Sequence, residues 1–417
     1  MGKVVSLDAP AERGKRQRRK RRRGSKTALV LGGGGFTGGV YEIGALRAFD
    51  LLAVNRTVNQ FDIYVGTSAG AFVGSAMANG ISPEEMMRVL NKRVPSPIED
   101  PDLGTLMKPN YLGFLRTAAS FPLRVANVAR QAALHVRETS MMDVAVGLVE
   151  GLPAGLYSNR GMESYVEEVF SDADRTNDFR ELAPELYVTA TDLDTTERIV
   201  LGEGEWADVP ISRAVAASTA LPMVYAPVEI RGRTLIDGGI RSTTNLDVAV
   251  ERGATFIVVV NPLVPYENRD GNVPSKLGRK VRRIGEMGFA AVGYQAFRVM
   301  AHARLHEAMA RWEERYPGVD IILIEPEPDD ELMFGTSILD FRARLAIARH
   351  GFESVTVKLA QDYQRYKEIA ARHGIEISAT RVNRVLEQVE EEEEKISAWR
   401  RVLEQTTGAL LRQSGSG

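Results

Sequence analysis

The sequence predicts an α/β fold with a mostly parallel central sheet and helices on both of its faces. Short apolar runs, of which residues 28–31 are the first, are typical of buried strands. Helical spacings of apolar residues follow such runs, as in Val40, Ile43 and Leu46. This alternation of strand and helix patterns indicates βαβ units. A chain of 417 residues is also long enough to bury a substantial core.

The first two predicted strands each run into a glycine-containing loop and then into a helix. Residues 28–31 lead into a glycine-rich stretch over 32–39, and a helix follows. Residues 61–65 predict the second strand, which enters the turn Gly66-Thr67-Ser68-Ala69-Gly70 and a helix of small residues through 77. Each order of strand, loop and helix is one half of a βαβ unit.

An inserted helical layer is expected over residues 84–150. From 104 to 137 the chain has five basic residues and no acid, and large apolar residues such as Phe114, Leu115 and Phe121 lie among them. Two interpretations are open. The layer either buries its aromatic residues at a lipid surface while its cations meet anionic phosphates, or forms a lid or dimer face with its apolar residues packed inward.

The rest of the chain continues the alternation of strands and helices. The predicted elements are a helix over 162–170, a strand over 185–191, a short helix over 211–219, a hairpin over 228–236, a strand over 254–260, a long helix over about 280–315 and a strand over 320–324. The hairpin turns at Arg231-Gly232-Arg233.

The composition excludes several kinds of site. The chain has no cysteine, which excludes disulfides, thiolate metal sites and a cysteine nucleophile, and which fits a reducing cytoplasm. Of the five histidines only His302 and His306 share a helical face. Because no zinc pattern surrounds them, we expect a packed or solvent-facing pair and no metal. The longest uncharged stretch, residues 63–83, is too polar and too rich in glycine to span a membrane.

The two ends of the chain differ from its body. Residues 13–26 hold ten Lys or Arg and no acid, although the whole chain has a net charge of −2. We expect a disordered arm over 1–25, which either contacts anionic lipid or nucleic acid or is a plain solvated tail. From about 382 apolar residues recur at a spacing of three and four that Glu392 interrupts. This pattern predicts a C-terminal helix that forms a weak coiled coil or packs on its own domain.

Ser68 lies in a Gly-x-Ser-x-Gly pattern between a predicted strand and a predicted helix. In such a turn the serine hydroxyl is lifted into the open, and Gly66 and Gly70 avoid clashes that Cβ atoms would cause. The N-terminus of the following helix favours a developing negative charge. The pattern alone is weak, but its strand and helix context strengthens it, so the sequence predicts a nucleophilic serine.

The glycine-rich stretch has two interpretations. Gly33-x-Gly35-x-x-Gly38 between a strand and a helix fits a dinucleotide fingerprint. That fingerprint expects an acidic residue about 20 residues on, at the end of the next strand. Asp50 lies within a helix and Asp62 opens a strand, so neither fits well. The other interpretation is a ribbon of N–H groups that forms an oxyanion hole, and the nearby serine favours it.

A nucleophilic serine needs a base, and the sequence places no histidine at the end of a strand. Asp237 lies at such an end, before Gly238 and Gly239. A partly desolvated carboxylate at hydrogen-bond distance can take the serine proton directly. A turn residue without a chemical role is the competing interpretation. Asp192 and Asp194 end another strand and are alternatives of the same kind.

With these motifs in this order, the chain resembles the patatin-like phospholipases. The resemblance rests on the glycine-rich residues 33–38, the serine turn at 66–70 and Asp237-Gly238-Gly239. The approach to the aspartate over 214–239 and the segment Gly155-Leu156-Tyr157-Ser158 are similar as well. Together these features cover about residues 27–250.

The resemblance implies a three-layer α/β/α sandwich of patatin type, here with a C-terminal helical extension. It also implies an acyl-ester hydrolase in which Ser68 is the nucleophile and Asp237 the base, without histidine. No metal and no organic cofactor would be needed. The N–H groups of the oxyanion hole would come from Gly33, Gly34, Gly35 and Ala69, and the residues that support the motifs would be Gly38, Gly66, Gly70, Gly238 and Gly239.

Two positions depart from the family pattern. Members usually carry Arg where this chain has Thr37, which puts the resting shape of the oxyanion hole in question. A loosened glycine loop would give a low basal activity that Thr37→Arg would raise. After Asp237-Gly238-Gly239 the usual continuation contains Asn-Asn-x-Pro, and here Asn245 is a candidate stand-in.

The sequence therefore predicts four segments. They are the basic arm over 1–25, a patatin-like catalytic domain over 26–265 that includes the 84–150 insert, the remainder of the α/β domain with long helices over 266–378, and the C-terminal helix and frayed tail over 379–417.

We expect a cytoplasmic, peripherally membrane-associated lipid acyl hydrolase of phospholipase A or lysophospholipase type. Its expected partners are a lipid or phospholipid substrate, a membrane surface, and a second copy of the chain through the C-terminal helix, whereas nucleic acid is not expected. Two alternatives remain: a weakly active or inactive patatin-fold protein that binds lipid or a partner, and a nucleotide-binding protein that uses the glycine loop.

Overall fold

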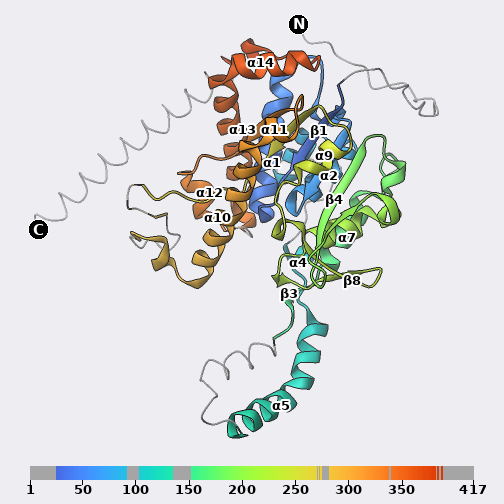
Figure 1. The fold of residues 1–417 in the computed structure, drawn as a ribbon, viewed down its shortest axis with the longest axis vertical. Coiled ribbons are helices and arrows are strands. Elements are labelled where there is room, and N and C mark those ends of the chain that lie inside the picture. The colour runs from blue at the N-terminus through green and yellow to red at the C-terminus, as the bar shows by residue number, and fades with distance from the viewer. Residues whose placement is uncertain are drawn as a thin grey trace, which may run out of the picture.

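The computed structural model describes residues 25–91, 103–134, 152–269, 271, 273–274, 281–337, 340–381, 383, 384 and 387. The predicted basic arm, part of the insert and most of the predicted C-terminal helix lie outside these residues. The described residues form a layered body from which one helix projects (Figure 1).

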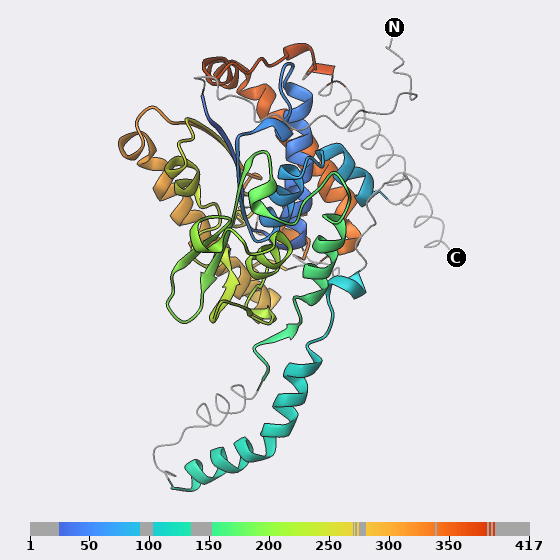
Figure 2. The same cartoon turned by 90° about the vertical axis from the view of Figure 1, so that its right-hand side faces the viewer.

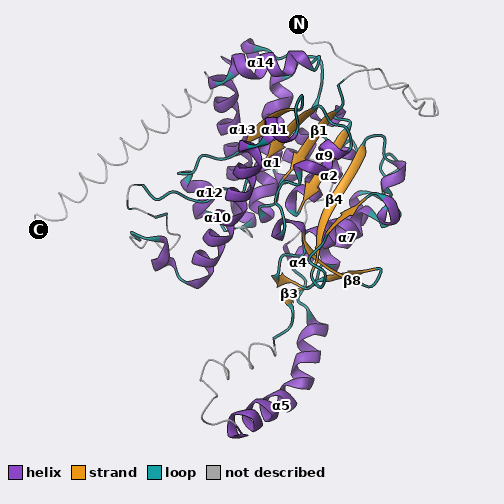
Figure 3. Cartoon of the chain, in the orientation of Figure 1, coloured by secondary structure: helices purple, strands orange, loops and turns teal. Residues whose placement is uncertain are grey.

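A sheet of eight strands forms the centre of the body (Figure 3). The strand order is β10-β9-β1-β2-β4-β8-β7, and β5 pairs with β4. Neighbours from β10 to β4 are parallel, whereas β5, β7 and β8 are antiparallel to their partners. The strands are β1 (Thr27–Leu31), β2 (Ile63–Thr67), β4 (Glu185–Asp192), β5 (Arg198–Leu201), β7 (Val228–Ile230), β8 (Arg233–Asp237), β9 (Phe256–Val260) and β10 (Asp320–Ile324). A separate pair consists of β3 (Gly155–Tyr157) and β6 (Met223–Tyr225).

Helices cover both faces of the sheet because its inner strands are apolar on both sides. In β1, Leu29 and Leu31 belong to one core, whereas Ala28 and Val30 belong to the other. The first core is covered by α1 (Gly35–Leu52), α2 (Ala69–Ala78), α3 (Pro83–Leu90), α7 (Arg160–Val169), α8 (Ile211–Ser218), α13 (Arg344–Gln361) and α14 (Tyr363–Arg372). The second is covered by α9 (Leu246–Glu251), α10 (Phe289–Ala310) and α11 (Trp312–Arg315). The predicted three-layer α/β/α architecture is confirmed.

The predicted elements differ from the observed ones mainly at their ends. Helix α1 already begins at Gly35, so the glycine loop is shorter than expected and spans only residues 32–34. The long helix predicted over 280–315 is interrupted. Gly288, with a φ of 90°, precedes α10, and α11 follows as a separate short turn of helix. Strands β3, β5 and β6 were not predicted, because runs of three or four residues are too short to show a period.

The described part of the predicted insert contains helices, but one of them does not lie on the sheet. Helix α3 contributes Met86 and Val89 to the core, and the short helix α4 (Leu103–Leu106) contacts α7. Helix α5 (Tyr111–Leu134) instead projects away from the body in both views (Figures 1 and 2). None of the described helices has the length and apolar character that a membrane span requires.

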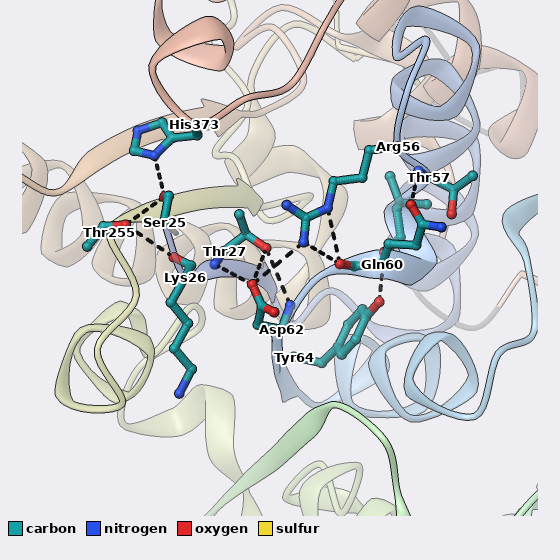
Figure 4. A network of polar contacts seen from close by, with 11 residues as sticks. Ser25, Lys26, Thr27, Arg56, Thr57, Gln60, Asp62, Tyr64, Thr255 and His373 are labelled. Atoms are coloured by element: carbon teal, nitrogen blue, oxygen red, sulfur yellow. Dashed lines mark hydrogen bonds and ion pairs between the residues drawn. The ribbon is translucent and has the colours of Figure 1, made fainter. Parts of the chain in front are cut away.

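A polar network ties the start of the described chain to the amino ends of the strands (Figure 4). Ser25 Oγ lies 2.7 Å from Thr255 Oγ1 and also contacts the ring of His373. The backbone N–H and the hydroxyl of Thr27 both donate to Asp62 Oδ2 at 2.9 Å. Asp62 is therefore engaged at the opposite end of the strands from the glycine loop. This position argues against its serving the glycine loop as the acidic residue of a dinucleotide site.

Candidate active site

The register of three neighbouring strands brings Ser68 and Asp237 to the same level of the sheet. Thr67, the last residue of β2, lies opposite Thr189 of β4. Asp237, the last residue of β8, lies opposite Ala190 on the other side of β4. Because β8 overlaps only the last three residues of β4, its carboxyl end reaches this level although it runs antiparallel. The two side chains therefore flank β4 at the edge where the glycine loop follows β1.

Ser68 occupies a sharp turn between β2 and α2. Its φ of 55° and ψ of −122° form a conformation that residues with a side chain rarely adopt, and such strain is common at functional sites. Neighbouring backbone packs tightly around the turn. A Cβ atom on Gly66 would lie 2.5 Å from the Cα of Ala71, and one on Gly70 would lie 2.5 Å from the carbonyl of Leu31. Only glycine fits at either position.

A second serine, which the sequence analysis missed, holds this turn in place. Ser218, the last residue of α8, accepts a hydrogen bond of 2.8 Å from the backbone N–H of Ser68. Its own hydroxyl donates to the backbone oxygen of Thr189 at 2.6 Å. The signal available was only its place in the segment 214–222, which the family resemblance singled out without a role for any one residue. Ser218 links the turn at Ser68 to β4.

Ser68 and Asp237 form a direct, buried hydrogen bond. Ser68 Oγ donates to Asp237 Oδ2 at 2.6 Å, and the backbone N–H of Gly239 donates to Oδ1 at 2.7 Å. Burial raises the pKa of Asp237 to about 6, although the hydrogen bonds from Ser68 and Gly239 oppose this rise. The carboxylate is still ionised at neutral pH, and it is a stronger base than an exposed aspartate. This geometry lets Asp237 take the proton of the Ser68 hydroxyl.

The alternative carboxylates have other partners. Asp192 Oδ1 accepts from the N–H of Asp194 at 3.0 Å, and Oδ2 accepts from Arg233 at 2.8 Å. Burial opposes ionisation of Asp192, but these hydrogen bonds outweigh burial and hold its pKa below the ordinary value. Neither Asp192 nor Asp194 lines the cavity at Ser68. A carboxylate that is paired with arginine and has a lowered pKa is a weak general base.

The histidines of the described residues lie outside the cavity at Ser68. His302, His306 and Glu325 form a cluster in which one ligand atom from each lies within 4.8 Å of the others. No pattern in the sequence pointed to Glu325. His306 Nε2 lies 2.9 Å from Glu325 Oε2, and Asn261 donates to Oε1 at 2.7 Å. Burial and the neighbouring His306 lower the pKa of His302. A hydrogen bond thus joins His306 to Glu325, whereas His302 contacts His306 through its ring, with the ring centroids 4.0 Å apart. His350 contacts Asp330 instead.

The four N–H groups expected to bind an oxyanion differ in their present partners. Gly33 lies beside Ser68, since a Cβ on it would be 3.3 Å from the Ser68 Cβ, but its N–H donates to Thr243 O at 3.2 Å. The N–H groups of Gly34, Gly35 and Ala69 have no acceptor among the described residues. Gly35 and Ala69 begin α1 and α2, where N–H groups are free and the helix dipole favours an anion. Gly33 can join them only if its bond to Thr243 breaks.

Both departures from the family pattern have local partners. Thr37 is 4% exposed in the first turn of α1, and its hydroxyl donates to Ser337 O at 2.7 Å. Asn245 has a φ of 39°, and its Nδ2 donates to the hydroxyls of Thr67 and Thr189 at 3.0 Å each. Asn245 therefore braces the last residue of β2, directly before Ser68. Thr37 ties the end of the glycine loop to the segment before α13, so the structure has a tether where the sequence suggested a loosened loop.

Thr37→Val removes this tether while it keeps the shape of the side chain. We expect a loss of about 1 kcal/mol in the free energy of unfolding and a several-fold lower turnover, because one buried hydrogen bond at the glycine loop is lost. Thr37→Arg has no room at this buried position, so we expect it to destabilise the fold and not to raise basal turnover. Thermal unfolding and initial rates measure both effects. An arginine variant as stable as wild type and faster would restore the expectation from the sequence.

A cavity of about 170 Å³ opens onto Ser68 and Asp237 and is almost entirely apolar. The glycine loop, Ser68 and Asp237 lie in its wall. The apolar side chains that line it include Phe36, Val40, Ile43, Phe72, Val73, Met86, Leu106, Met162, Tyr165, Leu221, Tyr225, Leu263 and Phe297. An apolar cavity that ends at a serine hydrogen-bonded to a buried carboxylate suits the acyl chain of an ester.

Comparison with known proteins agrees with the sequence motifs. The family model described as patatin-like phospholipase matches residues 29–250. Among solved structures, VipD from Legionella pneumophila is 14% identical, and the match covers 82% of this chain and 67% of that one with a TM-score of 0.34. ExoU in complex with SpcU, from the type III secretion system of Pseudomonas aeruginosa, is also 14% identical. That match covers 84% of this chain and 59%, less than two thirds, of the ExoU chain, with a TM-score of 0.29. Neither structural likeness is close enough to carry an argument.

Proposed function

The chain belongs to the patatin-like phospholipase family, a family of lipid hydrolases, and from this premise we propose that it hydrolyses carboxylic esters of lipids with a Ser68–Asp237 dyad. The observation that carries the proposal is the 2.6 Å hydrogen bond from Ser68 Oγ to the buried carboxylate of Asp237. The apolar cavity beside this pair supports a substrate with a long acyl chain, which this cavity would bind. The reaction type that fits best is that of a phospholipase A or lysophospholipase.

The reaction runs through an acyl-enzyme in two steps. Ser68 Oγ attacks the acyl carbonyl carbon while its proton passes to Asp237, and the carbonyl oxygen becomes an oxyanion. The N–H groups of Gly34, Gly35 and Ala69 stabilise this charge. The C–O bond to the alcohol then breaks, and Asp237 returns the proton to the leaving oxygen. In the second step a water gives a proton to Asp237 and attacks the acyl carbon of the ester on Ser68. The bond between this carbon and Ser68 Oγ then breaks, Asp237 passes its proton to Oγ, and the fatty acid leaves.

Mass spectrometry of lipid products tests this function directly. Wild-type protein incubated with phospholipid vesicles is expected to release free fatty acid and a lysophospholipid, and with lysophospholipid to release fatty acid and the glycerophosphodiester that carries the head group. A protein that binds these vesicles but releases neither product in any lipid would instead be the inactive, lipid-binding member considered from the sequence. Release of phosphate or of a phosphorylated head group would contradict an acyl hydrolase.

We further propose that helix α5 contacts the membrane that holds the substrate. Leu115 and Leu123 are 68% and 71% exposed on this projecting helix, and Tyr111 and Leu112 are exposed as well. The helix has no acidic residue. Exposed apolar side chains beside arginines suit the interface of an anionic bilayer, where each well-placed charge contributes roughly 1 kcal/mol.

Liposome flotation tests this contact. Full-length protein is expected to float with anionic vesicles at low salt, and deletion of residues 1–25 should weaken flotation because basic charges are lost. Replacing Leu112, Leu115 and Leu123 with serine should weaken it at least about tenfold, since three exposed apolar groups no longer enter the bilayer. The matched control replaces Val54, Leu332 and Leu345, which are also exposed, with serine.

Flotation that is unaffected by the deletion and by the serine substitutions, or that does not depend on salt, would show that α5 is not the membrane contact. If α5 instead forms a dimer interface, sedimentation should show that the triple serine variant is a monomer where wild type is a dimer, and flotation should not change.

A further inference from the structure

A second cavity, of about 840 Å³, adjoins the catalytic one. Gly239, Thr243 and Phe297 line both cavities, so the loop that follows Asp237 separates them. The wall of the second cavity carries hydroxyl groups and arginines, in contrast to the apolar wall at Ser68. A ligand that crosses this loop therefore has an apolar environment on one side and a polar, cationic one on the other.

Three arginines of the second cavity have no ion pair to a carboxylate within the described part of the chain: Arg241, Arg304 and Arg315. Arg241 donates to Thr196 O at 2.9 Å, and Arg304 donates to the backbone oxygen of Arg241 at 3.0 Å. The guanidinium of Arg315 lies 5.3 Å from the centre of the Tyr316 ring. A guanidinium has five N–H donors, so most of the donors of these arginines remain for a ligand.

Both carboxylates that line this cavity have arginine partners, and one of these partners, Arg198, also lies in the wall of the cavity. Asp247 pairs with Arg198 at 2.7 Å, and Glu197 lies 3.5 Å from Arg233. The cavity therefore has an excess of positive charge, although the chain outside its basic N-terminal arm is acidic. Arginine forks match the oxygens of a phosphate in geometry as well as in charge. The hydroxyls of Ser242 and Thr244 add neutral hydrogen-bonding groups to the same wall.

We propose that this cavity binds the phosphate-bearing head group of an anionic phospholipid whose acyl chain lies in the cavity at Ser68. The proposal rests on the proposed function, because it names the class of substrate for the same dyad. In a glycerophospholipid the ester lies between the acyl chain and the phosphate, just as the loop at Gly239 lies between the two cavities. Phosphatidylglycerol is therefore preferred to phosphatidylcholine, whose quaternary amine the arginines repel.

The test uses the full chain and the double variant Arg241→Gln/Arg315→Gln. The matched control, Arg311→Gln/Arg342→Gln, removes the same charge from arginines that do not line the cavity. Substrates are the short-chain dihexanoyl phosphatidylglycerol, dihexanoyl phosphatidylcholine, and p-nitrophenyl butyrate, which has no head group. For the cavity variant we expect KM for the phosphatidylglycerol to rise at least about tenfold, because two charged contacts to phosphate are lost. KM for the phosphatidylcholine should rise less, because the same variant also removes the repulsion between the arginines and the choline cation. Rates with p-nitrophenyl butyrate, and all rates of the control variant, should stay within about twofold of wild type.

An equal effect on both phospholipids, or no effect on either, would overturn the proposal. Binding is measured apart from turnover, by the thermal shift that dihexanoyl phosphatidylglycerol or inorganic phosphate gives. The lipid should stabilise wild type more than phosphate does, and the cavity variant should lose this difference. If phosphate alone stabilises as strongly as the lipid, the cavity is a free-anion site and the head-group assignment is wrong. If wild type hydrolyses none of the three esters, the proposed function fails, while the thermal shifts still decide on the cavity.

Discussion

Ser68→Ala is expected to lower ester hydrolysis by at least about 1,000-fold, because the acyl-enzyme cannot form without the serine oxygen. The small activity that remains would come from substrate binding and from the N–H groups of the oxyanion hole. Initial rates with a chromogenic ester and with a phospholipid measure the loss.

Ser75→Ala is the matched control for this variant. Ser75 is also buried in α2, but its hydroxyl donates to the backbone oxygen of Ala71 and does not line the catalytic cavity. We expect Ser75→Ala to keep activity within about threefold of wild type, since it only removes a local hydrogen bond. A folded Ser68→Ala protein that keeps more than a tenth of wild-type activity would contradict its role as nucleophile.

Asp237→Asn should lower turnover at least about a hundredfold, because the amide keeps the shape of the side chain but accepts no proton. His302→Ala and His350→Ala should have little effect, since neither histidine lines the cavity at Ser68. Far-ultraviolet circular dichroism verifies that each variant is folded. Loss of activity in a folded histidine variant, together with activity in Asp237→Asn, would mean that the base has been assigned wrongly.

The pH dependence of wild type follows from the same carboxylate. Only the ionised form of Asp237 can accept the serine proton, and burial raises the pKa of Asp237 to about 6. Activity should therefore rise with pH, reach half its maximum near pH 6 and level off above pH 7. A half-maximum near pH 4, the range of an exposed aspartate, would contradict a buried base.

Stability should change with pH in the opposite direction. Since the pKa of Asp237 is higher in the folded than in the unfolded state, the folded state holds its proton more tightly, and this group's contribution to stability falls as pH rises from about 4 to about 6. Above that range the burial of the charge is fully unfavourable. Asp237→Asn should therefore raise the Tm relative to wild type at pH 8, and the difference should shrink as pH falls from about 6 to about 4. Differential scanning calorimetry at several pH values measures both trends.

The fold and the positions of Ser68 and Asp237 follow largely from local patterns in the sequence. The apolar runs that became β1, β2 and β9 are buried on both faces, as parallel inner strands are, and this burial made them recognisable. Gly66 and Gly70 can be recognised in the sequence as structurally required, because tight backbone packing allows no other residue at these positions. The hairpin turn at Arg231 and Gly232, where φ is 54° and 74°, is a local signal of the same kind.

The contacts that tune the site were not predictable, because they join residues far apart in the chain. Ser218 meets Ser68 only because α8 packs beside β4. The carbonyl of Thr243 reaches Gly33 only because the loop after β8 folds back over the glycine loop. The arginines of the second cavity come from β5, from that loop and from α10 and α11, which no local pattern connects. The sequence did not predict that α1 begins as early as Gly35, because consecutive glycines suggest a loop. Packing against Pro262 and α13 supports a helix here.

Labelling with a fluorophosphonate, which reacts only with an activated serine, tests the Ser68–Asp237 dyad most directly. Peptide mass spectrometry of the labelled wild-type protein should place one adduct on Ser68, and Ser68→Ala should carry none. Asp237→Asn should react at least about a hundredfold more slowly, because the hydroxyl has lost its base. A wild-type protein that stays unlabelled in every lipid tested, or an adduct on another residue that persists in Ser68→Ala, would contradict the dyad.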